Sequence, residues 1–142
     1  MTGQKDRYST TEKQWKIDDE QLTTPRHDEM VLSLLNKPAL ENICSLLKYT
    51  ITDDRFLIRS ELPITTSSGF IIGYWDVAYL SMTGSSIYIE VKPTVDSFGK
   101  VLRQINTYRR YQISRHDIVV LYTDDKRFVD AFESQDIRVI SP

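Results

Sequence analysis

The stretch that decides the fold is FIIGYWDVAYLSMTGSSIYIEVK, residues 70–92. Two runs rich in β-branched and aromatic residues, 70–80 and 86–92, flank the short polar turn 81–85. This pattern predicts two antiparallel strands joined as a hairpin. Pro93 is expected to end the second strand, because proline cannot donate a hydrogen bond to a central ladder.

The hydrophobic pattern also predicts the register of this hairpin. A turn centred on Thr83 places Asp76 opposite Glu90. Side chains alternate between the two faces of a strand, so Asp76, Glu90 and Lys92 are expected on one face. The other face would be apolar, with Trp75 opposite Val91, Val77 opposite Ile89, and Tyr79 opposite Ile87. A slip of one residue would bury the charges, and the pattern therefore favours this register.

Two carboxylates that face each other across a sheet destabilise it unless something neutralises their charge. Lys92 can neutralise one charge, and a divalent cation would neutralise the rest. Carboxylate and carbonyl oxygens are ligands that suit Mg²⁺ or Mn²⁺. Two interpretations stay open at this point. One is a metal site, and the other is a surface salt bridge between Lys92 and an acid, worth about 0–1 kcal/mol.

On the N-terminal side of the hairpin, the sequence predicts an arm, two helices and a strand. Residues 1–23 are polar and carry mixed charges, which indicates a flexible arm. Thr24, followed by a proline, is typical of a helix N-terminus, and a second helix can begin at Pro38. Both segments repeat apolar residues at helical spacing. The strand 56–62 is expected to end at the proline that follows it.

On the C-terminal side, helices and strands alternate. Apolar periodicity predicts a helix ending near residue 112 and a short helix around 128–132, and apolar runs predict strands at 118–122 and 137–140. The chain would therefore form one α/β domain over residues 24–142. We expect a mixed central β-sheet flanked by helices on both faces.

Composition narrows the class of protein. The chain has 142 residues, of which 40% are hydrophobic and 27% charged, as in ordinary globular domains. Cys44 is the only cysteine, which excludes a disulfide framework or a cysteine-held iron–sulfur cluster within one chain. Because no apolar run approaches the ~18 residues of a membrane span and no apolar leader opens the chain, we expect an intracellular protein without a membrane partner.

Three motifs follow one another along the chain: Gly73-x-x-Asp76, Glu90-x-Lys92 and Gln104-x-x-x-Tyr108. This ordered set resembles the PD-(D/E)xK nuclease superfamily, and its last motif is similar to that of the RecB-like exonuclease branch. The resemblance covers roughly residues 24–140 and implies a restriction-endonuclease-like core of order αβββαβ. The chain departs from the pattern at Trp75, where the superfamily commonly has proline.

The resemblance implies a Mg²⁺-dependent deoxyribonuclease, in which Mn²⁺ can substitute. Asp76 and Glu90 would bind the metal, and the carbonyl of Val91 would complete the ligand set. Lys92 would orient or activate the attacking water and stabilise developing negative charge. No iron–sulfur cluster is expected, because the cysteine cluster of some RecB-like nucleases is missing from this sequence.

Further roles follow from the same resemblance. Members of the superfamily usually supply one more acid from the first helix or the first strand, and Glu29 and Glu61 are the two candidates. The sequence does not choose between them. Gln104 and Tyr108 are spaced to share one face of a helix. They would line the catalytic cleft and contact the nucleic-acid backbone or fix the active-site lysine.

Local charge indicates where nucleic acid would bind. The segment 92–116 has a net charge of +5 in a protein whose total is −2. A basic strip with interleaved aromatic residues is the expected footprint of DNA, with RNA as an alternative. A solvated helix flank is the other interpretation. The binding candidates are Lys100, Arg103, Gln104, Tyr108, Arg109 and Tyr111. No histidine is required as a base, and His27 and His116 are expected on the surface.

Competing functions remain open at the level of sequence. The same fold could hold nucleic acid or a protein partner without cleavage. It could also act as a structure-selective endonuclease of the Holliday-junction type or as a restriction-type endonuclease, and both would call for a homodimer. The biological setting stays open among DNA repair, recombination, restriction, and a virus or mobile element.

Overall fold

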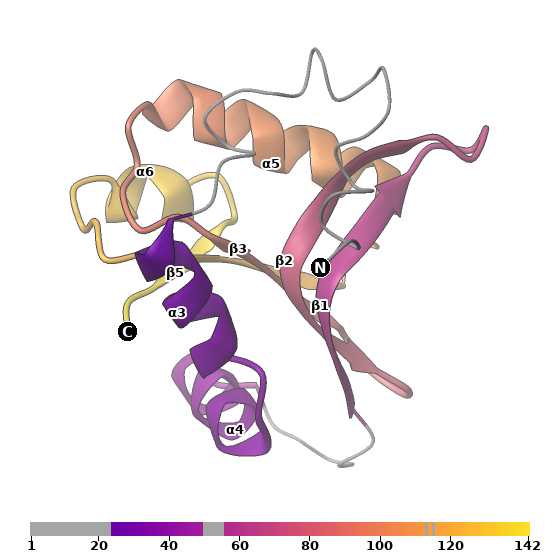
Figure 1. The fold of residues 1–142 in the computed structure, drawn as a ribbon, viewed down its shortest axis with the longest axis horizontal. Helices are drawn as coiled ribbons and strands as arrows, with labels where there is room; N and C mark the ends of the chain where they lie inside the picture. Colours follow the sequence, from indigo (N-terminus) through magenta and orange to yellow (C-terminus); the bar gives the residue numbers. More distant parts are fainter. Residues whose placement is uncertain (1–23, 50–55, 113, 115) are drawn as a thin grey trace.

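A five-stranded β-sheet with helices on both faces is the framework of the structure (Figure 1). The structure is a computed structural model, and it describes residues 24–49, 56–112, 114 and 116–142. The predicted N-terminal arm, residues 1–23, lies outside the described residues. The coarse prediction of an α/β domain with a mixed sheet flanked by helices is confirmed.

Two capped helices precede the sheet. Helix α3 (Pro25–Ser33) begins after Thr24, whose Oγ1 accepts a hydrogen bond from His27 N at 3.1 Å, as the Thr-Pro sequence predicted. Helix α4 (Lys37–Leu46) begins one residue before the predicted Pro38. Its N-cap is Asn36, whose Oδ1 accepts from Ala39 N at 2.8 Å.

The strands lie in the sheet in the order of the sequence. Neighbouring strands are antiparallel from β1 to β3 and parallel from β3 to β5. The parallel connections carry helix α5 (Phe98–Gln112) and the short helix α6 (Val129–Glu133). The strands are β1 (Phe56–Thr65), β2 (Ile71–Ser81), β3 (Ile87–Val91), β4 (Ile118–Tyr122) and β5 (Arg138–Ile140).

The first strand is longer than the sequence predicted. Pro63 was expected to end it, but β1 continues to Thr65, and Pro63 pairs with Tyr74 of β2. The prediction was wrong because β1 is the edge strand of the sheet, with β2 as its sheet neighbour. A proline is tolerated on an edge strand, where the missing N–H would have faced solvent.

The predicted hairpin register is confirmed for two of its four pairs. Val77 pairs with Ile89 and Tyr79 pairs with Ile87 across β2 and β3. Asp76 directly precedes Val77 and Glu90 directly follows Ile89, so both acids lie at the point where this ladder ends. The sheet therefore brings together the two carboxylates that the sequence placed 14 residues apart.

Apolar side chains form a core on each face of the sheet. The α3–α4 core lies under helices α3 and α4 and takes five of the six residues predicted to share one face. The sixth, Trp75, lies in the α5 core on the opposite face, together with Ala78 and Tyr88 of the hairpin. The prediction for Trp75 was wrong, because β2 does not alternate regularly through Asp76.

Candidate active site

Asp76 lies where β2 parts from β3. Its Oδ2 accepts a hydrogen bond from Val91 N at 2.8 Å, and its Oδ1 lies 3.3 Å from His27 Nε2. The side chain is 16% exposed. A backbone amide and a histidine therefore fix the direction of this carboxylate.

Glu90 is the most deeply buried acid of the site. Its Oε2 lies 3.2 Å from Lys92 Nζ, whereas its Oε1 is buried and has no hydrogen-bond partner among the described residues. Burial and the negative charge of Asp76 raise the pKa of Glu90 to about 8, although Lys92 and His27 act in the opposite direction. The pair of facing carboxylates is thus under-neutralised by the protein itself.

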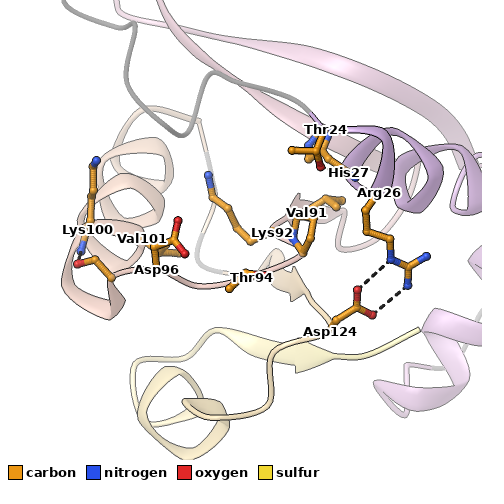
Figure 2. A pocket seen from close by; sticks show the side chains of 12 residues that line it. Thr24, Arg26, His27, Val91, Lys92, Thr94, Asp96, Lys100, Val101 and Asp124 are labelled. Atoms are coloured by element: carbon orange, nitrogen blue, oxygen red, sulfur yellow. Dashed lines mark hydrogen bonds and ion pairs between the residues drawn. The ribbon is translucent and has the colours of Figure 1, made fainter.

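Lys92 follows the last residue of β3 directly. Its backbone N–H donates to Tyr122 O at 3.0 Å, which continues the parallel ladder by one bond. Its side chain points into a pocket between the N-terminal ends of α3 and α5 (Figure 2). The volume of this pocket is about 570 Å³. The pocket has a mixed lining: Thr24, Arg26, His27, Val91, Lys92, Pro93, Thr94, Asp96, Ser97, Lys100, Val101 and Asp124.

His27 belongs to the site, which corrects the prediction that it lies on the surface. Its side chain is 15% exposed and reaches Asp76 from the first turn of α3. Burial lowers the pKa of His27, but hydrogen bonding and the charge of Asp76 outweigh burial, and the net pKa is raised. Helical spacing could have found this residue, because His27, Met30 and Leu34 follow one stripe of α3.

The two candidates for the additional acid lie in different places. Glu29 is exposed and pairs with Arg26, and two residues along a helix turn it to the side away from His27. Glu61 is exposed, but its neighbours Ser60 and Leu62 pair with Val77 and Trp75, the residues on either side of Asp76. It adopts a positive φ of 51°, in the left-handed region. The geometry brings Glu61, and not Glu29, to the level of the predicted metal ligands.

Gln104 and Tyr108 contact each other, as their spacing predicted. Gln104 Nε2 donates to Tyr108 Oη at 3.1 Å. Tyr108 is only 5% exposed and packs edge-to-face on Trp75, with ring centroids 5.4 Å apart. In this position the Tyr108 ring is part of the α5 core, and its surface is not presented to a nucleic acid.

The predicted basic strip divides into two groups. Arg103 and Tyr111 are exposed on α5, and Lys100 lines the pocket. Arg109 instead donates to the carbonyls of Gln135 and Asp136 at 3.0 Å, and it thereby ties α5 to the turn before β5. His116 is exposed, as expected.

An ion-paired turn holds the segment between Lys92 and α5. Val95 N donates to Asp125 Oδ2 at 3.0 Å, and Arg127 bonds both Asp125 and the carbonyl of Val95. Hydrogen bonds from Arg127 keep the pKa of Asp125 well below its usual range. Sequence reasoning missed these residues, because the contact joins segments 30 positions apart and no local pattern marks it.

Two carboxylates are the acidic donors that this site offers a metal. In the described part of the chain, no group of three or more His, Cys, Asp or Glu side chains could hold a metal ion. The fit with a cation rests on Glu90, whose Oε1 is a buried acceptor without a described partner, next to the Asp76 charge. Asp76, Glu90 and the Val91 carbonyl are oxygen donors of the type that Mg²⁺ and Mn²⁺ prefer.

Comparisons with family models, with curated proteins and with solved structures found no match to this chain. Among the described helices, none has the length and apolar character that crossing a membrane requires. The function must therefore be inferred from the residues of the site.

Proposed function

We propose that this chain is a metal-dependent nuclease that hydrolyses phosphodiester bonds of DNA, with a PD-(D/E)xK type of active site on a restriction-endonuclease-like core. The observation that carries the proposal is Glu90, a buried acid beside Asp76 with one oxygen on Lys92 and the other without a described partner. Burying a carboxylate in this way is unfavourable unless a cation compensates it. The arrangement supports a site that is completed by a metal.

The residues divide the chemistry among them. Asp76 and Glu90 would hold Mg²⁺ or Mn²⁺. The ion would supply a Lewis acid for the phosphate and a more acidic bound water. Val91 N–H keeps the Asp76 carboxylate oriented. Lys92 places a positive charge at the pocket, where negative charge builds on the phosphate oxygens during attack.

One observation favours a second candidate function. His27 lies 3.3 Å from Asp76 Oδ1, and a protonated His27 together with Lys92 would neutralise the two acids without a metal. The pocket would then be a binding site for nucleic acid or a protein, without cleavage. The two functions differ in their dependence on metal.

The test is cleavage of labelled single-stranded, double-stranded and branched DNA by the wild type and by Lys92→Ala, in Mg²⁺, Mn²⁺ or EDTA. Lys126→Ala is the matched control, because Lys126 is an exposed lysine outside the site. We expect metal-dependent cutting by the wild type and the control, and loss of cutting in Lys92→Ala. The ladder of products would separate exonuclease from endonuclease action.

Each contrary result has its own meaning. Binding of DNA without cutting, by a wild type that folds normally, would favour the binding module. Cutting that survives in Lys92→Ala would contradict the role of the lysine. The oligomeric state in solution would then test whether paired cuts arise from a homodimer.

A further inference from the structure

Strand β2 changes face at Asp76. Val77 and Tyr79 pack in the α3–α4 core, but Trp75 packs in the α5 core on the other side of the sheet. Residues two apart in a regular strand point to the same face, so the alternation breaks between Trp75 and Val77. The antiparallel ladder between β2 and β3 reaches only as far as the pair Val77 and Ile89.

Strand β1 changes face at the same level. The α3–α4 core takes Phe56 and Ile58 from the start of the strand, whereas the α5 core takes Leu62 and Ile64 from its end. Glu61 lies between these pairs and has a φ of 51°, and the residues on either side of it pair with the residues on either side of Asp76. A glutamate in this left-handed region is uncommon. One irregularity therefore crosses both strands, and Asp76 is at its centre.

Tyr108 lies against both residues that define the irregular end of β2. Its ring meets Trp75 edge-to-face at an interplanar angle of 77°. It also occupies the space beside Gly73, where an added Cβ would come within 2.5 Å of the ring carbons Cε1 and Cζ. Real Cβ atoms do not approach so closely, and only glycine at position 73 leaves room for the ring.

The position of the Asp76 carboxylate is connected with this break in the alternation of β2. Its carboxylate takes the Val91 N–H at the point where the ladder with β3 stops. In a regular strand, Trp75 would lie in the α3–α4 core. The backbone at position 76 would then have turned with Trp75, and the Asp76 carboxylate would have moved with it. We propose that Tyr108 is a positioning residue, whose ring holds Trp75 in the α5 core and thereby keeps the Asp76 carboxylate on the Val91 amide. The consequence for cleavage rests on the proposed function, whereas the consequence for this hydrogen bond does not.

The test compares the exchange of two neighbouring amide protons by NMR. Val91 N–H bonds Asp76 on the β2 side, and Lys92 N–H bonds Tyr122 O on the β4 side. In Tyr108→Leu, we expect Val91 to exchange roughly ten-fold faster relative to Lys92 than in the wild type, because only the Asp76 bond opens. Asp76→Ala gives the ratio for complete loss of that bond.

Two further variants separate positioning from general packing. Tyr108→Phe keeps the ring but loses the hydrogen bond from Gln104, and it should keep the wild-type ratio of the two exchange rates. Ile105→Ala creates a cavity in the same helix and the same core, and should lower stability without changing the ratio. If Tyr108→Leu fails to fold, Gly73→Ala displaces the ring from the other side and should raise the ratio as well.

The proposal would be overturned by a folded Tyr108→Leu or Gly73→Ala protein with a wild-type exchange ratio. It would also be overturned if Ile105→Ala raised the ratio as much as Tyr108→Leu does. Cleavage adds a separate readout: at saturating DNA, Tyr108→Leu should need roughly ten-fold more Mn²⁺ for half-maximal rate, with Tyr108→Phe close to the wild type. If no variant cuts DNA, the proposed function fails, while the exchange ratio still decides the role of Tyr108.

Discussion

At the scale of single residues, the site is defined by charges that the fold holds close together. Glu90 is buried with Asp76 nearby, and the Lys92 ammonium and the His27 imidazole approach the pair from different elements. This environment is unfavourable for the charged form of Glu90, but it holds the two carboxylates rigidly. Acidic groups with a pKa perturbed in this way are typical of functional sites.

Stability of the metal-free protein should fall as the pH rises from about 4.5 to about 8. Folding raises the pKa of Glu90 from 4.5 to about 8, so between these values the native state binds more protons than the unfolded state. The raised pKa of His27 acts with the same sign above its usual value of 6.5. For each pH unit in this range, we expect Glu90 to lower the free energy of unfolding by at most about 1.4 kcal/mol.

Urea denaturation between pH 5 and 8 in EDTA measures this slope. Glu90→Gln should flatten it, because the amide does not titrate. His27→Asn should remove only the part of the slope above pH 6.5. A slope unchanged in Glu90→Gln would show that the pKa of Glu90 is not raised in the native state.

The conformation of Glu61 gives a second prediction at this scale. Its φ of 51° is costly for a residue with a Cβ and free of strain for glycine. Glu61→Gly should therefore be more stable than Glu61→Ala by about 1 kcal/mol. Thermal unfolding in EDTA compares the two variants directly, and both lack the carboxylate. An alanine variant as stable as the glycine variant would contradict strain at this position.

At the scale of elements, the hairpin and the helix caps could be predicted, because both depend on local patterns. Alternation fixed Val77 opposite Ile89, and Thr24 had the chemistry of an N-cap. The side of the sheet that Trp75 packs on could not be predicted. It depends on Tyr108, which is 33 residues further along the chain, and no local period records that contact.

Helical spacing could have placed His27 on the buried stripe of α3, but it could not have found the partner of His27. The helix that carries it was predicted, but its partner Asp76 belongs to another layer of the fold. The end of β1 was missed for a related reason, since Pro63 ends a strand only where the strand has neighbours on both sides. The deciding information in each case is the position of an element relative to the others.

The cap of α3 should matter more to the site than the cap of α4. Thr24 holds the first turn, which carries His27, whereas Asn36 holds a helix that supplies none of the site residues. Thr24→Ala and Asn36→Ala should each cost about 1 kcal/mol in urea denaturation. Only Thr24→Ala should also alter the pKa of His27, measured by NMR titration. Equal pKa values in both variants would contradict a link between this cap and the site.

At the scale of the whole molecule, the site lies where the two kinds of strand pairing meet. The antiparallel hairpin brings Asp76 to β3. Strand β3 pairs in parallel with β4, and after β3 the chain continues through Lys92 into the segment before α5. Helix α3 closes the pocket from the other face, where Arg26 bonds Asp124 with two hydrogen bonds of 2.9 and 3.0 Å (Figure 2). Three separate parts of the chain thus meet at one pocket.

Because the site joins these parts, a ligand of its carboxylates should stabilise the whole domain. A cation present at 100 times its dissociation constant would add about 2.7 kcal/mol to the free energy of unfolding. We expect Mn²⁺ to raise the melting temperature at pH 8 by several degrees, and EDTA to reverse the change. At pH 5 the effect should be smaller, because a proton then competes for Glu90.

Asp76→Asn and Glu90→Gln should each abolish the Mn²⁺-dependent rise in melting temperature, and Glu29→Gln is the matched control on an exposed acid. This measurement needs no DNA, and it separates the two candidate functions before any substrate is known. A rise that persists in both site variants would place the cation elsewhere. A wild type that is not stabilised at all would favour the metal-free binding module, in which His27 and Lys92 alone neutralise the buried acids.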